Sequence, residues 1–178
     1  MLELLAPAGN LDAVIAAVQN GADAVYMGFG DGFNARRSAD NFTRESFAKA
    51  VRYCHIRGCK VYVTLNTLVG DREMDAAAAL AQQASDAGAD AILVQDLGLA
   101  RVLRAALPDI PLHASTQMSI HNLAGVEAAA EMGITRAVLA RELSLEQIRF
   151  ISQHASIETE VFVHGALCFC YSGQCYMS

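Results

Sequence analysis

Four side chains that can bind a metal lie close together near the end of the sequence. His164 is followed by Cys168, Cys170 and Cys175, which are three of the five cysteines in the chain. Thiolate and imidazole are donors that zinc and iron–sulfur clusters prefer. The spacing matches no common metal motif closely, and a free cysteine also packs as a small apolar residue. Metal binding and simple burial both stay open. Used together, the four would form a Cys₃His set suited to tetrahedral zinc, although the gap before Cys175 is wide for that metal.

A repeated pattern predicts the elements that position these residues. Helical stretches end at Gly21, Gly58, Gly88 and Gly133, and an apolar, partly β-branched run follows each one. Glycine suits the left-handed backbone position just after a helix. Nearly continuous apolar runs are typical of parallel strands buried on both faces, and their alternation with helices indicates βαβ units.

Counting these runs predicts the fold class. We expect strands near residues 3–6, 24–28, 61–66, 91–95, 111–116, 137–141 and 159–164, and helices near residues 10–19, 43–57, 72–86, 97–106, 122–132 and 145–154. This succession predicts an α/β fold of the (β/α)₈ TIM-barrel type, truncated to about seven strands. An open doubly wound sheet is the alternative, but no GxGxxG follows the first strand.

The chain is expected to form one incomplete barrel domain over residues 1–178, with a cysteine-rich segment at 164–178. An unclosed barrel exposes two strand edges, which a second copy or another chain could cover. Among the helix starts, Ser144 and Gln147 form a predicted capping box. Thr43 and Asp71 are expected N-caps.

Polar side chains follow most of the expected strands. Chemistry in a barrel takes place where strands end and helices begin, so these side chains predict a site for a small polar ligand or a nucleobase. His164, Gln117 and Asn66 are the candidate catalytic residues, and Asn34 and Gln117 are candidates for substrate binding. Each could instead be a helix cap or an ordinary loop residue.

Charged pairs occur at two of these strand ends. Arg36 and Arg37 could bind a carboxylate or a phosphate of the substrate, because an arginine fork matches both groups. Surface ion pairing with nearby aspartates is the alternative. Arg141 and Glu142 could belong to the site at the barrel rim or could form an internal ion pair there, and both alternatives stay open.

Composition restricts the class of protein. The chain is 53% hydrophobic and 18% charged, which is typical of a globular domain. No apolar run approaches the length of a membrane span, and the first residues do not form a signal peptide. Five cysteines without an export signal indicate a reducing, cytoplasmic location. The net charge of −6 argues mildly against this piece alone binding nucleic acid.

Several enzyme classes lack their characteristic residues. The two lysines, Lys49 and Lys60, fall in a helix and at the start of a strand, where neither is placed to form a Schiff base. Lys60 would lie on the stability face of a barrel. Neither HExxH nor GxSxG occurs, so zincin and serine-hydrolase chemistry have no recognisable basis.

A set of motifs along the whole chain resembles the collagenase-like peptidase family U32. The motifs are LLAPAGN at 4–10, GADAVYMG at 21–28, FNARR at 33–37, VTLNT at 63–67, ASTQMS at 114–119, LARELS at 139–144 and HGALCFCYSGQCYMS at 164–178. They look most similar to the branch that hydroxylates a cytidine of large-subunit ribosomal RNA. Sister branches hydroxylate transfer-RNA uridine or assist ubiquinone hydroxylation.

The resemblance implies a cofactor and a substrate. Where a cluster is assigned in the family, the cysteines matching Cys168 and Cys175 bind a [4Fe–4S] cluster together with two further cysteines downstream. RNA is the implied partner, and prephenate is the implied hydroxyl source in the transfer-RNA branch. The resemblance therefore predicts part of an RNA-hydroxylating enzyme. A peptidase and a non-catalytic cluster-binding accessory protein are the alternatives.

Overall fold

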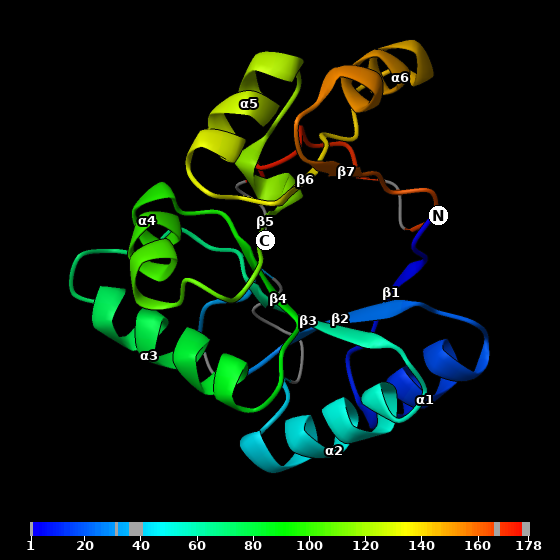
Figure 1. Ribbon diagram of the computed structural model, residues 1–178, viewed down its shortest axis with the longest axis vertical. Coiled ribbons are helices and arrows are strands. Elements are labelled where there is room, and N and C mark those ends of the chain that lie inside the picture. Colours follow the sequence, from blue (N-terminus) through cyan, green and yellow to red (C-terminus); the bar gives the residue numbers. More distant parts are fainter. Residues whose placement is uncertain (1, 31, 36–40, 166–167, 176–178) are drawn as a thin grey trace.

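Seven parallel strands form one sheet in which the spatial order follows the chain order, β1 to β7. The computed structural model describes residues 2–30, 32–35, 41–165 and 168–175. The strands are β1 (Leu5–Pro7), β2 (Ala24–Gly28), β3 (Lys60–Leu65), β4 (Ala91–Val94), β5 (Leu112–Ala114), β6 (Arg136–Val138) and β7 (Glu158–Glu160). Figure 1 shows them curving around a common centre with the helices outside. The expected TIM-barrel type of fold with seven strands is thus confirmed.

The helices that cover the outer face begin at polar caps. They are α1 (Leu11–Gln19), α2 (Arg44–His55), α3 (Met74–Asp86), α4 (Leu97–Ala106), α5 (Leu123–Glu131) and α6 (Leu145–His154). Ser144 and Gln147 form the predicted capping box of α6, and Thr43 caps α2. The prediction for Asp71 was wrong: α3 begins later, after Glu73, whose carboxylate instead accepts a bond from the Gly70 amide. None of the helices in the described ranges is long and apolar enough to cross a membrane.

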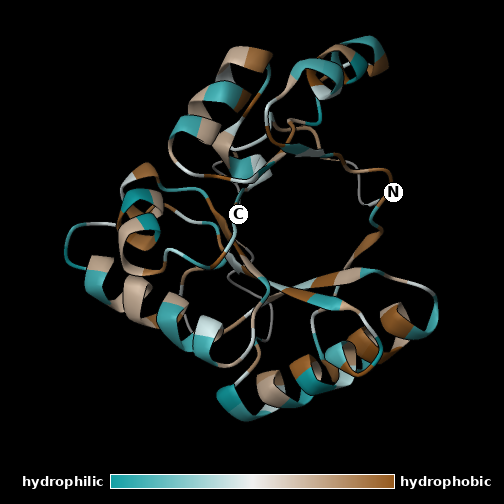
Figure 2. Cartoon of the chain, viewed as in Figure 1, coloured by the Kyte–Doolittle hydropathy of each residue, from teal (hydrophilic) through white to brown (hydrophobic). Residues whose placement is uncertain are grey.

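Two apolar clusters stabilise the sheet on its two faces. Along β2, Val25 and Met27 join the large core that packs against the helices, whereas Ala24 belongs to a small inner cluster with Tyr62. The alternation follows from the two-residue period of a strand. In Figure 2 the ribbons of α2, α3 and α4 alternate between hydrophobic and hydrophilic residues, as expected for helices with one buried face.

The last strand lies earlier in the chain than predicted. Val161, Phe162 and Val163 were expected to continue it, but β7 ends at Glu160 and these three side chains are exposed. The reason lies in the neighbouring strand, because β6 is short and its last register partner is Val138 opposite Glu160. Apolar residues beyond that point have no strand partner to extend the ladder.

The segment after β5, at the end of the barrel where the strands finish (the mouth), also differs from the prediction. The strand expected over 111–116 ends at Ala114, and the chain then forms the 3₁₀ helix η1 (Thr116–Met118). The Ser115 hydroxyl caps this turn by accepting a bond from the Gln117 amide. A side-chain cap that offers the backbone a partner favours a turn over continued extension.

Candidate active site and cysteine loop

The carboxyl ends of β3 and β5 are joined by a polar network. The Asn66 amide nitrogen donates to the Ser115 hydroxyl over 3.1 Å, and the Asn66 amide oxygen accepts from the Ala35 backbone nitrogen over 3.1 Å. Ser115 is buried, and its hydroxyl also accepts from the Gln117 amide. The Asn66 side chain and the Gln117 backbone amide are therefore linked through Ser115, one of the polar residues that follow the fifth strand.

Near the end of β2, two asparagine side chains are hydrogen-bonded to each other. The Asn34 amide donates to the side-chain oxygen of Asn41 over 3.1 Å. A Cβ on Gly28 would lie 2.0 Å from that oxygen, so a larger residue there would displace the bond between Asn34 and Asn41. Arg36 and Arg37 lie outside the described residues, and their role in binding an anion stays a prediction.

Residues 168–175, which we call the cysteine loop, are fixed to the barrel through Ser172. This side chain is fully buried. Its hydroxyl accepts from the backbone nitrogen and the Nε of Arg141 and donates to the Glu142 carboxylate. These three bonds use the one donor and both acceptor positions of the hydroxyl. The Ser172 amide also donates to Glu142 over 2.8 Å.

The same turn of the loop packs against the residues that follow β5. The Ser119 hydroxyl donates to the Ser172 carbonyl over 2.5 Å. Gly173 has a φ of +73°, and a Cβ there would lie 2.3 Å from the Gln117 carbonyl oxygen. Glycine is required on both grounds, since the left-handed backbone and the close approach each disfavour a side chain.

The internal ion pair between Arg141 and Glu142, one of the two alternatives, is not formed; both residues bond to Ser172 instead. Glu142 also contacts His121, whose Nε2 lies 3.2 Å from the second carboxylate oxygen. Partial burial opposes ionisation of Glu142, but the bonds from Ser172 and the nearby His121 hold its pKa below the usual range. The two residues therefore attach the cysteine loop to the barrel rim.

The guanidinium of Arg141 also favours the thiolate form of Cys168. Its side-chain hydrogen bond is the main cause that lowers the pKa of this exposed thiol. The second terminal nitrogen of Arg141 donates to the Cys170 carbonyl over 3.1 Å. Cys170 behaves differently, because its interaction with the neighbouring Cys175 thiol raises its pKa. All five cysteines lie in the described part of the chain, and no disulfide joins any two of them.

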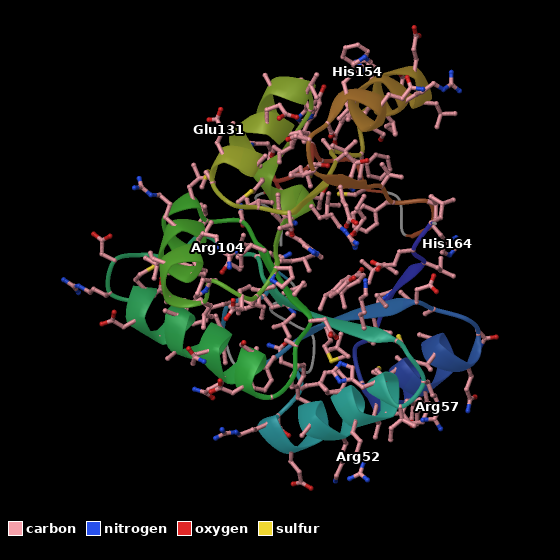
Figure 3. The ribbon with its side chains drawn as sticks, viewed as in Figure 1. Arg52, Arg57, Arg104, Glu131, His154 and His164 are labelled. Carbon is pink, nitrogen blue, oxygen red and sulfur yellow. The ribbon has the colours of Figure 1, made fainter. Side chains whose placement is uncertain are left out.

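The donor set fits a metal only in part. Within the described residues, no three histidine, cysteine, aspartate or glutamate side chains gather closely enough to hold an ion. His164 lies beside the gap between the edge strands (Figure 3). The local zinc set is therefore not assembled here and stays a prediction. Arg141 favours the thiolate of Cys168, and Cys175 lies nearby. These two cysteines could therefore supply two of the four ligands of an iron–sulfur cluster.

A pocket of about 250 Å³ opens between the cysteine loop and the rim. It is lined by Arg141, Glu142, Cys168, Phe169, Cys170 and Tyr171. The pocket therefore combines thiols, a guanidinium, a carboxylate and two aromatic rings at the end of the barrel where strands finish.

Comparison with known sequences decides the family. Residues 9–178 match the sequence profile described as Peptidase family U32. The chain belongs to this family. The solved structure of the U32 peptidase Mk0906 superposes on it with a TM-score of 0.73 and 18% identity, covering 90% of this chain and 68% of the other, which supports the fold.

Two curated U32 relatives carry names that refer to RNA. The chain is 45% identical over 177 residues to "23S rRNA 5-hydroxycytidine C2501 synthase" of Escherichia coli, covering 99% of this chain and 26% of the relative. It is 42% identical over 176 residues to "tRNA hydroxylation protein P1" of Bacillus subtilis, covering 99% of this chain and 42% of the relative. The chain thus spans less than half the length of either protein.

Three of the seven U32 motifs identified in the sequence meet at one place in the fold. The segments at 114–119, 139–144 and 164–178 supply the end of β5, the Arg141–Glu142 rim and the cysteine loop. Sequence reasoning missed Ser172 and Ser119. Ser172 and Gly173 belong to a recognisable motif, but the sequence does not show which rim residues they contact. Those contacts depend on how the barrel brings distant segments together.

Proposed function

We propose that this chain is the barrel part of an enzyme that hydroxylates a pyrimidine base in ribosomal or transfer RNA, with a [4Fe–4S] cluster held in part by Cys168 and Cys175. The observation that carries the proposal is the Cys168 thiol beside Arg141, on a loop attached to the catalytic end of the barrel. The names of the U32 relatives, which refer to rRNA and tRNA hydroxylation, support the substrate class.

Cys168 and Cys175 would hold the cluster from this chain, and the other donors would come from residues outside it. An iron–sulfur cluster supplies one-electron transfer when bound. Arg141 stabilises the thiolate that a soft metal requires, since metal binding needs a deprotonated cysteine. Ser172 and Glu142 keep the loop at the rim, where Cys168 and Cys170 line the pocket.

The polar groups of the mouth would orient the base. A ring carbon inside a duplex is out of reach for a barrel mouth, so the base must be unstacked first. The amides of Asn66 and Gln117 can each donate to and accept from the edge of a base. Arg36, Arg37 and Asn34 are the proposed contacts for a phosphate or for the carboxylates of a co-substrate such as prephenate. His164 is the candidate for proton transfer, and the amides of Asn66 and Gln117 are the candidates for holding the reacting base in place.

The deciding experiment measures hydroxylated pyrimidines in RNA by mass spectrometry, in cells that lack the gene and in cells complemented with its full-length product. We expect one hydroxylation to disappear in the deletion and to return with the wild type but not with Cys168→Ala or Cys175→Ala. Cys54→Ala is the matched control, because this buried thiol packs in the core away from the loop. RNA that keeps every hydroxylation in the deletion strain rejects the proposal, and cluster binding with unchanged RNA points to the accessory role.

A peptidase is the second candidate, in line with the family name. An exposed thiol with a lowered pKa has the property that a cysteine nucleophile needs. Cleavage of a peptide library by metal-free protein, lost in Cys168→Ala, would support it. Absence of cleavage between pH 5 and 9 would remove this candidate.

A further inference from the structure

The cysteine loop has an anchored inner side and an exposed aromatic outer side. Ser172 and Gly173 pack against the rim, as described above. On either side of Cys170, by contrast, Phe169 is fully exposed and Tyr171 is 66% exposed. The bonds that hold the loop are made by Ser172 and by the backbone, and they leave both rings at the surface. Large aromatic side chains that are exposed to solvent at the edge of a pocket indicate a ligand-binding surface.

The lining of the pocket indicates the chemistry of the ligand. The two rings lie in one pocket with Arg141 and Glu142. Aromatic faces bind flat, unsaturated molecules through stacking, and a guanidinium binds phosphate or carbonyl oxygen. Arg141 donates to the Ser172 hydroxyl, to the Cys170 carbonyl and to the Cys168 thiol, which leaves two of the five N–H donors of a guanidinium for a ligand. A planar ligand with an anionic attachment fits this combination.

We propose that Phe169 and Tyr171 form the stacking platform for an unpaired RNA base, with Arg141 beside them as the contact for its phosphate or its carbonyl edge. This inference rests on the proposed function, because it identifies where the substrate base of that enzyme would bind. It places the base next to Cys168, and thereby next to the site of the proposed cluster. Base stacking tolerates any base, so the platform would supply affinity, while the choice of nucleotide would come from other residues.

The test uses the full-length protein and fluorescence anisotropy with two probes: a fluorescein-labelled oligocytidylate, and an abasic ribose-phosphate strand of the same length. We expect Phe169→Ala and Tyr171→Ala each to weaken binding of the oligocytidylate roughly 10-fold, since one stacked base contributes on that order. Tyr171→Phe keeps the ring and should bind like the wild type. The abasic strand should bind equally weakly to all of them.

The matched control is Phe150→Ala, which removes another exposed aromatic ring, on α6. Unchanged oligocytidylate binding in both Phe169→Ala and Tyr171→Ala overturns the inference. So does a large drop in the thermal unfolding midpoint of these two variants, because the rings would then pack against other parts of the protein. Anisotropy does not depend on hydroxylation, so a protein that stacks bases but leaves RNA unmodified would reject the proposed function while keeping the platform.

Discussion

Arg136 on β6 and Glu3, just before β1, form an ion pair across the inside of the incomplete barrel, although they lie 133 residues apart in the sequence. The distance between Nη1 and Oε1 is 2.5 Å. Arg136 also binds Glu158 of β7, and Glu3 accepts from Tyr62 and Lys60 of β3. The network therefore connects the two ends of the sheet at the side where it is open.

Removal of Arg136 should destabilise the fold strongly. In Arg136→Met, Glu160 would remain partly buried without its cation and Glu3 would keep only the more exposed Lys60, and breaking a buried pair on one side costs about 3 kcal/mol. Urea denaturation followed by circular dichroism measures the change. Arg149→Met, which removes an exposed arginine on α6, is the control and should change the free energy of unfolding by less than about 0.5 kcal/mol. Equal stability of the two variants would show that the network does not hold the sheet ends together.

The sequence was sufficient to predict which elements form, and it was less informative about what lies between them. Periodic apolar runs and glycines after helices predict strands and helices because these signals are local. Lys60 was correctly assigned to the stability face, where it binds Glu3. That its partner is Glu3, and that Arg136 joins them, depends on the curvature of the sheet, which no local pattern encodes.

In the candidate site, too, local signals could be recognised in the sequence but contacts between distant residues could not. Cysteines and strand-end amides can be recognised by residue type, and the structure joins the Asn66 side chain and the Gln117 backbone amide through Ser115. The alternative of an ion pair between Arg141 and Glu142 was wrong because adjacent residues of opposite charge need not face each other. Both bond to Ser172, which is distant in sequence and carries no distinctive signal as a single serine.

His113 should make the protein less stable as the medium is acidified. Burial, and secondly the nearby Arg136, lower the pKa of His113 to about 3, from an ordinary value near 6.5. Between these values the unfolded chain binds a proton that the folded chain does not, so the free energy of unfolding falls as pH falls. The loss from His113 between pH 7 and pH 5 should be about 2 kcal/mol.

Urea denaturation at pH 7 and pH 5 measures this loss. His113→Gln, which carries no titrating group, should show a difference between the two pH values that is smaller by that amount. His154→Gln is the control, since that side chain is exposed at the end of α6. Burial opposes ionisation of Glu3, but Arg136, Lys60 and Tyr62 hold its pKa at about 2. The contribution of Glu3 to the free energy of unfolding is therefore lost only below pH 4.5, outside the range of this measurement. An acid loss that persists fully in His113→Gln would contradict the assignment.

The attachment of the cysteine loop should fail when Gly173 gains a side chain. In Gly173→Ala the new Cβ would meet the Gln117 carbonyl and the Ser119 hydroxyl, and the left-handed backbone would be strained as well. We expect faster amide hydrogen exchange across residues 168–175 and reduced iron content of full-length protein purified without oxygen. Gly9→Ala is the matched control, because a Cβ there has nothing within 4 Å. Protection of the loop that matches the control would show that it is held by other contacts.

The network at the strand ends gives a separate test of the mouth. Asn66→Ala removes the bond that holds the Ala35 amide and the bond to Ser115, at a cost of about 1 kcal/mol for each bond. Hydrogen exchange of residues 32–35 should increase, whereas exchange in the cysteine loop should stay unchanged, since the loop is attached through Ser172 and not through Asn66. Under the proposed function, RNA hydroxylation by the full-length variant should fall while its iron content stays normal. Loss of the cluster in Asn66→Ala would show instead that the two parts of the mouth depend on each other, and that the amide network supports the cysteines rather than the base.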